Sequence, residues 1–284
     1  MITVLEVIKR STEFLAGKGI EGARLNAEHL VGHALGLARM QLYLQFERPL
    51  TEAELERIRP LVRRRGLHEP LQYILGGVEF CGLKLKVDRR ALIPRPETEH
   101  LVELVVERRQ SAPPQDVLEL GTGTGAIALA LAARYPAATV TAAEIDAGAL
   151  ALAAENAAAN GLDGRVEWVA SDWYAALPPG RRFDLIVSNP PYLSEAEVAE
   201  TAPEVRNFEP TGALTPGGDG LAALGQIIAG APARLAPGGL IALETGIAQH
   251  EALRAQAAAA GLEGFESVPD LTGRPRYVFA RAAG

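Results

Sequence analysis

The sequence predicts a doubly wound α/β domain with a mostly parallel, seven-stranded sheet, preceded by a small all-helical domain. Three observations support this: apolar strands alternate with alanine-rich helices from residue 116 onward, apolar residues recur at helical spacing before residue 72, and a glycine-rich turn follows the first strand. Such alternation favours a parallel sheet with helices on both faces. We therefore expect a helical domain at 1–72, a β-hairpin connector at 73–94 and the α/β domain at 95–284.

Composition indicates a globular protein of the cytoplasm. Of its 284 residues, 48% are hydrophobic and 22% are charged, which is enough apolar material for a substantial core. No apolar run approaches the ~18 residues of a membrane helix, and no export signal is recognised. The single cysteine, Cys81, excludes an internal disulfide and a thiolate metal site. The net charge of −7 argues against nonspecific nucleic-acid binding. We expect a monomer with no metal, no membrane partner and no direct nucleic-acid binding.

The helical domain is predicted from apolar spacing and from one capping signal. Two segments carry the spacing, with Val4, Leu5, Ile8 and Leu15 in the first and Leu25, Leu30, Val31 and Leu35 in the second. Thr51 and Glu54 form a capping-box pattern that begins another helix. The basic cluster Arg63–Arg65 is interpreted as a solvated helix face, with docking to a partner as the alternative.

Strands are predicted from short apolar runs. In the connector, Phe80, Leu83, Leu85 and Val87 alternate with other residues, as in a hairpin. The seven predicted strands of the α/β domain lie at 116–120, 139–144, 166–170, 183–188, 240–246, 265–270 and 276–282.

A glycine-rich turn follows the first of these seven strands. Gly121, Gly123 and Gly125 lie where the strand becomes a helix, so the backbone can approach a ligand closely. Glu144 ends the next strand, where a carboxylate can accept hydrogen bonds from both hydroxyls of a ribose. Together they predict a nucleoside site, although tight turns also need glycine. Gly-Thr-Gly-Thr-Gly-Ala satisfies the dinucleotide fingerprint as well, which leaves NAD as a rival.

The ends of the third and fourth strands argue against NAD. Asp172 and Trp173 offer an acceptor for an adenine amino group and an aromatic ring beside it. The alternative for Asp172 is the N-cap of a helix. The fourth strand ends in Ser-Asn-Pro-Pro-Tyr, next to the switch point at which open α/β sheets bind ligands.

The Asn-Pro-Pro-Tyr corner is predicted to bind a planar NH2 group. Pro190 and Pro191 restrict the backbone and remove two N–H donors, which leaves the Asn189 side-chain oxygen and main-chain carbonyls as acceptors. An NH2 group conjugated to a carbonyl or a ring is a poor nucleophile, and two accepted hydrogen bonds can align its nitrogen with a methyl sulfonium. Tyr192 is expected to stack on the planar group. The alternative is a rigid strand terminator with a buried tyrosine.

These motifs together resemble the class I S-adenosyl-methionine methyltransferases, and Asn-Pro-Pro-Tyr resembles the branch that methylates planar NH2 groups. The segments PLQYILGGVEFCGLKLKVDRRALIPRPETE, NFEPTGALTPGGDGL and DLTGRPRYVFARA resemble one family, the release-factor glutamine methyltransferases (HemK/PrmC), over essentially the whole chain. The resemblance implies a Rossmann-like fold and methyl transfer from S-adenosyl-methionine to the glutamine side-chain nitrogen in the Gly-Gly-Gln loop of class 1 peptide chain release factors. The implied product is S-adenosyl-homocysteine.

The resemblance also implies roles for individual residues. The cofactor residues are Glu119, Gly121, Thr122, Gly123, Gly125, Glu144, Ile145, Asp172, Trp173 and Asn189. The glutamine is held by the catalytic set Asn189, Pro190, Pro191 and Tyr192. Many relatives carry aspartate where this chain has Glu144, and either carboxylate can bind a diol. Arg-Pro-Glu-Thr-Glu resembles the signature beside the active site, where Arg95 and Glu97 either contact substrate or form a structural salt bridge.

Two other classes of function stay open. A methyltransferase acting on adenine or guanine amino groups would use the same corner and flip its base into it. An acidic chain with a helical N-terminal domain offers no clear RNA-binding surface for that role. A nucleotide-responsive binding protein without catalysis would bind the cofactor and methylate no amide.

Overall fold

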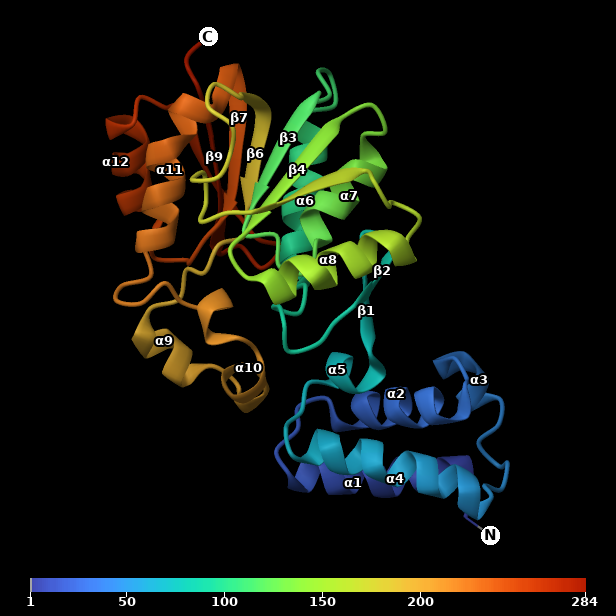
Figure 1. The fold of residues 1–284 in the computed structure, drawn as a ribbon. Coiled ribbons are helices and arrows are strands. Elements are labelled where there is room, and N and C mark those ends of the chain that lie inside the picture. The colour runs from blue at the N-terminus through green and yellow to red at the C-terminus, as the bar shows by residue number, and fades with distance from the viewer. Residues whose placement is uncertain (1) are drawn as a thin grey trace. The chain divides into compact units, whose positions relative to one another are not determined.

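The computed structural model describes residues 2–284, which form two compact units (Figure 1). One unit contains the chain up to Gly77 together with Ala202–Phe208, and the other contains Val78–Thr201 and Glu209–Gly284. The sequence places Ala202–Phe208 in the α/β part of the chain, whereas packing places it with the N-terminal helices. A short helix in this segment carries Glu204, which forms an ion pair with Arg65 of the helical unit.

The first unit is helical, as predicted. Its helices are α1 (Val4–Gly17), α2 (Ala23–Leu35), α3 (Arg39–Tyr43), α4 (Glu52–Gly66), α5 (Leu71–Leu75) and α10 (Pro203–Phe208). Apolar faces of α1, α2 and α4 meet in one core that includes Ile8, Leu30 and Ile58. The capping box at the start of α4 is confirmed, because Thr51 Oγ1 accepts from Glu54 N at 3.3 Å and the Glu54 carboxylate accepts from Thr51 N at 2.9 Å.

The three consecutive arginines of α4 do not share one solvated face. Arg65 is only 4% exposed; its guanidinium donates to Asn26 Oδ1 at 2.7 Å and pairs with Glu204 at 3.0 Å. Arg64 pairs with Glu69 at 2.6 Å. The interpretation of Arg63–Arg65 as a solvated cluster is therefore wrong for Arg65, because successive helical residues point about 100° apart and the packing of α4 turns this one toward Asn26.

The second unit contains the predicted seven-stranded sheet. Its strands are β3 (Asp116–Leu120), β4 (Thr139–Glu144), β5 (Val166–Ala170), β6 (Phe183–Ser188), β7 (Leu235–Glu244), β8 (Glu263–Pro269) and β9 (Pro275–Arg281). The order is β5-β4-β3-β6-β7-β9-β8. Strands β3 to β7 pair in parallel, and β9 runs antiparallel to both β7 and β8. The prediction of a mostly parallel sheet is confirmed.

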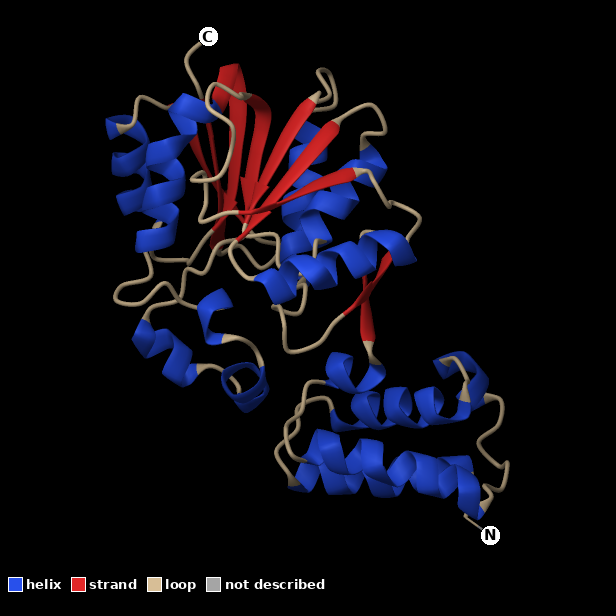
Figure 2. Cartoon of the chain, viewed as in Figure 1, coloured by secondary structure: helices blue, strands red, loops and turns tan. Residues whose placement is uncertain are grey.

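Helices cover both faces of this sheet (Figure 2). They are α6 (Pro96–Arg108), α7 (Ala126–Arg134), α8 (Ala147–Ala159), α11 (Ala222–Arg234) and α12 (His250–Ala259), while α9 (Glu195–Glu200) and the short 3₁₀ helix Thr211–Ala213 lie in the connections. Strand β6 shows the two-sided burial: Leu185 and Val187 join the core under α6 and α7, and Ile186 joins the core under α11 and α12. Within residues 2–284, no helix is both long and apolar enough to span a bilayer.

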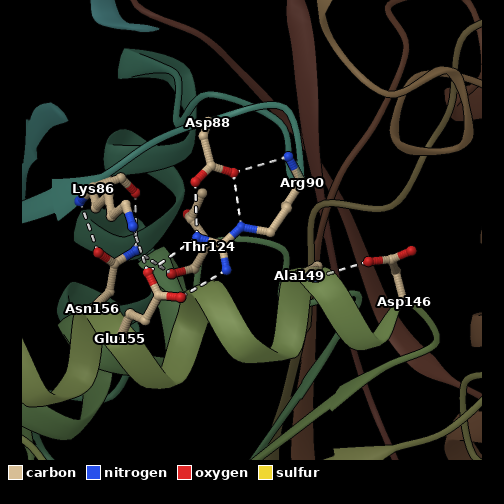
Figure 3. Close-up of polar contacts among 8 residues, drawn as sticks. All are labelled: Lys86, Asp88, Arg90, Thr124, Asp146, Ala149, Glu155 and Asn156. Atoms are coloured by element: carbon tan, nitrogen blue, oxygen red, sulfur yellow. Dashed lines mark hydrogen bonds and ion pairs between the residues drawn. The ribbon is translucent and has the colours of Figure 1, made fainter. Parts of the chain in front are cut away.

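The connector forms the hairpin β1 (Gly77–Phe80) and β2 (Leu83–Lys86), and helix α8 holds the chain that follows it (Figure 3). Asn156 Oδ1 accepts from Lys86 N at 2.7 Å, and its Nδ2 donates to Lys86 O at 3.1 Å and to Thr124 O at 2.9 Å. Arg90 pairs with Asp88 at 2.8 Å and with Glu155 at 2.7 Å. These bonds fix the path of residues 89–92, which line the cavity described next.

Candidate active site

The candidate site lies at the carboxyl ends of the central strands. The chain leaves β3 toward β4 and β5 on one side and returns to β6 and β7 on the other, so the topological switch point lies between β3 and β6. In register, Leu120 of β3 pairs with Ala143 of β4 and with Ser188 of β6. Gly121, Glu144 and Asn189 therefore follow at the same edge of the sheet, and a cavity of about 580 Å³ opens there.

The glycine turn has the backbone that only glycine adopts easily. Gly121, Gly123 and Gly125 all have positive φ, at 71°, 55° and 82°. At Gly125, an added Cβ would lie 3.1 Å from the Ala153 Cβ, so glycine also permits close packing of α7 on α8. The turn therefore needs its glycines for conformation and for packing. Gly121, Thr122 and Gly123 line the cavity, whereas Gly125 is not among the described residues that do so, and its contact with the cofactor stays a prediction.

Glu144 ties this turn to the end of β4. Its Oε2 accepts from Gly123 N at 2.9 Å, and its Oε1 accepts from Ile145 N at 2.9 Å and from Asp146 N at 3.1 Å. A carboxylate has about four acceptor sites, so three backbone bonds leave room for one more donor. A ribose diol with two hydroxyls would have to share or displace one of the existing bonds.

Glu119 is a carboxyl group buried in the cavity wall. It is 1% exposed, accepts from Ala128 N at 2.9 Å, and also accepts from the Thr122 hydroxyl. Burial raises the pKa of Glu119 to about 8; the charge of Glu144 acts in the same direction, and the bonds from Thr122 and Ala128 oppose it. A cation bound in the cavity would favour the ionised form.

The segment after β5 places an aromatic ring over the glycine turn. Trp173 has φ of 46°, which is uncommon for a residue other than glycine, and an added Cβ at Gly121 would lie 3.4 Å from its Cζ3. The Ser171 hydroxyl donates to Trp173 O at 2.8 Å and fixes this turn. In the described part of the chain, no helix lies between Asp172 and the start of β6. The alternative that Asp172 is the N-cap of a helix is therefore wrong. Ile145, 72% exposed, adds an apolar surface at the cavity wall.

Asn189 and Pro191 line the same cavity. The Asn189 Nδ2 donates to Thr98 Oγ1 at 2.9 Å, and Tyr192 donates its hydroxyl to Glu244 Oε1 at 3.0 Å. Burial raises the pKa of the Tyr192 phenol. Pro190 and Tyr192 are not among the described residues that line the cavity, so stacking of Tyr192 on a substrate stays a prediction.

Arg95 forms a structural salt bridge, although not with Glu97. Its guanidinium lies 2.5 Å from Glu209, whose buried carboxylate also accepts from Ile93 N at 3.0 Å. The main-chain oxygen of Glu97 accepts from the Tyr277 hydroxyl at 2.8 Å. Within residues 2–284, neither Arg95 nor Glu97 belongs to the cavity lining, and their contact with substrate stays a prediction.

Sequence reasoning missed several residues of the site. They are Thr98 and Glu244, together with the lining segment 89–92 and the lining residues Pro210, Gly212 and Ala213. One signal for Glu244 was available, because a carboxylate at the end of the apolar run Leu-Ile-Ala-Leu needs buried donors. Thr98 belongs to the Arg-Pro-Glu-Thr-Glu segment, but nothing local in the sequence indicates its partners.

Comparison with known proteins identifies the family. Residues 6–76 match the PrmC N-terminal domain, and residues 97–219 match the methyltransferase small domain. The chain is 44% identical to the release factor glutamine methyltransferase of Cereibacter sphaeroides, over 97% of each chain. It is 46% identical to that of Bordetella pertussis, over 93% of this chain and 96% of that one.

A solved structure supports the fold alone. The hMettl16 catalytic domain, in complex with MAT2A 3′UTR hairpin 6, matches with a TM-score of 0.57 at 17% identity, over 71% of this chain and 76% of that one. Because the identity to the full-length relatives is high over nearly the whole chain, the family expected from the sequence is confirmed: the chain belongs to the release factor glutamine methyltransferases.

Proposed function

We propose that the protein transfers a methyl group from S-adenosyl-methionine to a glutamine side-chain nitrogen in class 1 peptide chain release factors, within their Gly-Gly-Gln loop. One observation carries the proposal. The same cavity is lined by the glycine turn and Glu144 and also by Asn189 and Pro191. A nucleoside site and a corner of hydrogen-bond acceptors thus share one space. Family membership indicates the class of substrate.

The residues of the cavity fit the cofactor. The glycine turn allows close approach of a ligand, Glu144 offers acceptors to ribose hydroxyls, and Trp173 and Ile145 offer apolar surfaces to a flat ring. Asp172 at the wall offers an acceptor to an adenine amino group. When bound, S-adenosyl-methionine supplies an electrophilic methyl group on a sulfonium centre, with S-adenosyl-homocysteine as product.

The chain's own contribution at the other end is positioning. Asn189 Oδ1 and the carbonyls of the Pro190–Pro191 corner can accept both hydrogens of a substrate amide NH2. These acceptors align the nitrogen and stabilise the positive charge that develops on it during methyl transfer. The proton leaves after the new bond has formed, so no protein base has to remove it first. Tyr192 is proposed to support the corner that holds the glutamine.

Mass spectrometry of a methylated release factor tests the proposal. The full-length protein is incubated with isotope-labelled S-adenosyl-methionine and a purified class 1 release factor, and the factor is digested and its peptides mapped. We expect the label on one peptide, on the glutamine of Gly-Gly-Gln. A release factor with that glutamine replaced by glutamate is the matched control and should take up no label.

The same reaction with other acceptors separates the alternatives. Label transferred to RNA or DNA but not to the release factor would point to a nucleic-acid amino methyltransferase. Tight cofactor binding with no transfer to any acceptor would point to a binding protein. Either result would contradict the proposal.

A further inference from the structure

Behind the Asn-Pro-Pro-Tyr corner lies a series of hydrogen bonds, part-buried at Asn189 and buried at Glu244, that the proposed chemistry has not yet used. It runs from Asn189, after β6, to Thr98 on α6 and then to Glu244 at the end of β7. Asn189 Nδ2 lies 2.9 Å from Thr98 Oγ1, and Thr98 Oγ1 lies 2.7 Å from Glu244 Oε2. Thr98 and Glu244 are 4% and 2% exposed, so water does not readily replace the bond between them. Helix α6 and strand β7 are in contact.

While Glu244 is ionised, the hydrogen bonds from Asn189 to Thr98 and from Thr98 to Glu244 can have only one donor-to-acceptor direction. A carboxylate accepts hydrogen bonds and donates none, so the single hydroxyl hydrogen of Thr98 must point to Glu244. The Thr98 oxygen then faces Asn189 with its lone pairs and can only accept. Asn189 must therefore turn its NH2 group toward Thr98, and its Oδ1 is left to face the opposite way. The reverse orientation would place two oxygens together without a hydrogen and leave a buried acceptor unsatisfied.

We infer that Thr98 and Glu244 are positioning residues that fix which end of the Asn189 amide faces the substrate. This inference rests on the proposed amide substrate. An asparagine side chain is nearly symmetric in shape, and only its hydrogen-bond partners decide between the oxygen and the NH2 group. A substrate NH2 group needs an acceptor. An asparagine turned the wrong way would present a second donor and could not accept a hydrogen bond from the substrate NH2 group.

Hydrogen bonds and a nearby cation oppose the effect of burial on the Glu244 carboxylate, although the net shift of its pKa is upward. Its second oxygen, Oε1, accepts from the Tyr192 hydroxyl at 3.0 Å, and Arg276 Nη1 lies 3.4 Å from that hydroxyl oxygen. Burial raises the pKa of Glu244 and the nearby Glu97 adds to this, whereas the bonds from Thr98 and Tyr192 and the charge of Arg276 favour the ionised form. Tyr192, the last residue of the corner, thus has a place in this network that does not require contact with substrate.

Substitutions at Thr98 test the chain of hydrogen bonds. Thr98→Val keeps the shape and removes the hydroxyl, and Thr98→Ser keeps the hydroxyl and removes the methyl group. In single-turnover methylation of a release factor, we expect Val to lower the rate about ten- to a hundredfold and Ser to stay within about threefold of wild type. Cofactor affinity, measured in parallel by calorimetry, should be unchanged in both. Equal loss in both variants would show a packing role and would overturn the inference.

A double-mutant cycle between positions 189 and 244 gives the sharper test. Glu244→Gln alone lets an NH2 group donate to Thr98, which permits the reversed orientation of Asn189, so the rate should fall. Asn189→Asp has two acceptor oxygens whichever way it turns, but it competes with Glu244 for the one hydrogen of Thr98. Adding Glu244→Gln to Asn189→Asp removes that competition, so the rate should rise by about threefold or more. A merely structural Glu244 would lose activity in both backgrounds, which would refute the inference.

Nuclear magnetic resonance can determine the orientation of the Asn189 side-chain amide without measuring catalytic activity. In isotope-labelled full-length protein, the side-chain NH2 protons of Asn189 should give a through-space cross-peak to the Thr98 β-proton, and Thr98→Val should expose them to solvent exchange. Absence of the cross-peak in wild type would overturn the inference by itself. If wild type methylates no glutamine, the proposed function fails while this result still stands. If wild type is active and Thr98→Val equals it, only the positioning role fails.

Discussion

Three glutamates near the carboxyl ends of strands lie at or near the candidate site, and each has different hydrogen-bond partners. Glu119 of β3 is a buried carboxyl at the cavity wall, Glu144 of β4 organises the glycine turn, and Glu244 of β7 supports Asn189 through Thr98. Each sits in or after an apolar strand, so each depends on donors from elsewhere in the fold. Their different partners give the same side-chain type three different tasks.

Replacement of Glu144 should weaken cofactor binding. Glu144→Ala removes the acceptors for the ribose and also the bond to Gly123 N that shapes the turn. We expect affinity for S-adenosyl-methionine to fall about ten- to 150-fold, as for about 1.5–3 kcal/mol of lost charge-assisted hydrogen bonds. Titration calorimetry measures this, with Glu263→Ala on the exposed start of β8 as control. Unchanged affinity in Glu144→Ala would remove this residue from the cofactor site.

Cofactor affinity should depend on pH through Glu119. Burial raises its pKa to about 8 in the free protein, and a bound sulfonium cation favours the carboxylate. Binding below pH ~8 therefore releases a proton, and affinity should fall as the pH is lowered toward ~6.5, by at most about tenfold per unit. Calorimetry in two buffers of different ionisation enthalpy counts the protons released.

The Glu119→Gln variant separates this effect from titration of the cofactor's own amino group. It should release fewer protons than wild type. The same shift of pKa predicts an effect on the stability of the fold. Because the pKa of Glu119 is higher in the folded than in the unfolded protein, the free energy of unfolding should fall as the pH rises from the ordinary pKa of a glutamate to about 8. Glu119→Gln should therefore melt higher than wild type at alkaline pH. Equal proton release by the two proteins would contradict the assignment.

Among the elements, α8 links the connector to the cofactor cavity. Asn156 lies in the last turn of this helix and Asn160 caps its carboxyl end, and each binds the main chain of one residue of β2, as a neighbouring strand would. Asn156 binds both main-chain groups of Lys86, and Asn160 binds both of Lys84, at 3.0 and 2.9 Å. The Asn156 side chain is fully buried, and the segment that it binds leads into residues 89–92 at the cavity.

These two asparagines give a matched pair of variants. Asn156→Ala leaves one buried main-chain group, Thr124 O, and two part-buried ones, Lys86 N and O, without their partner, and it should lower the free energy of unfolding by about 2–4 kcal/mol. Asn160→Ala affects more exposed hydrogen bonds and should cost about 0.5–1.5 kcal/mol. Urea unfolding followed by circular dichroism measures both. Cofactor affinity should drop only in Asn156→Ala, and equal effects of the two variants would argue against a special role for the buried Asn156.

At the scale of the whole molecule, the helical unit is predicted to recognise the protein substrate and to contribute no chemistry. A surface pocket of about 340 Å³ between α1 and α4 combines apolar side chains, including the 42% exposed Phe14, with Arg10, Arg59 and Arg63. Such a mixture suits a protein surface better than a small substrate. The described residues of this pocket include none that the cofactor cavity uses.

Full-length variants test this role. Phe14→Ala with Arg63→Ala should lower kcat/KM on an intact release factor about tenfold or more, because an aromatic and a basic anchor are lost. Activity on a short Gly-Gly-Gln peptide and cofactor affinity should not change. Arg64→Ala, which loses an ion pair to Glu69 outside the pocket, is the control. If the double variant methylates the intact factor as fast as wild type, recognition through this pocket is wrong.

Much of the fold was predictable because its signals are local. The alternation of strands and helices, the capping box at Thr51 and the glycine turn each occupy a few consecutive residues, and short-range geometry decides them. The interior direction of a helix is less local. Arg65 was expected in solvent, yet the packing of α4 turns it toward Asn26, and hydrophobicity alone does not predict which of three consecutive arginines is buried.

The sequence by itself determined the class of sheet, the glycine-rich turn and the rigid Asn-Pro-Pro-Tyr corner, since each depends on residue types within one segment. Only the tertiary structure decided which distant residues meet. Arg95 pairs with Glu209, 114 positions away, Asn189 binds Thr98 across 91 positions, and Thr98 binds Glu244 across 146. A carboxylate within an apolar strand indicates that hydrogen-bond donors must lie nearby, but the tertiary fold determines which residues supply them. For this protein, that selection gives Asn189 the Thr98–Glu244 partners from which we infer the orientation of its amide.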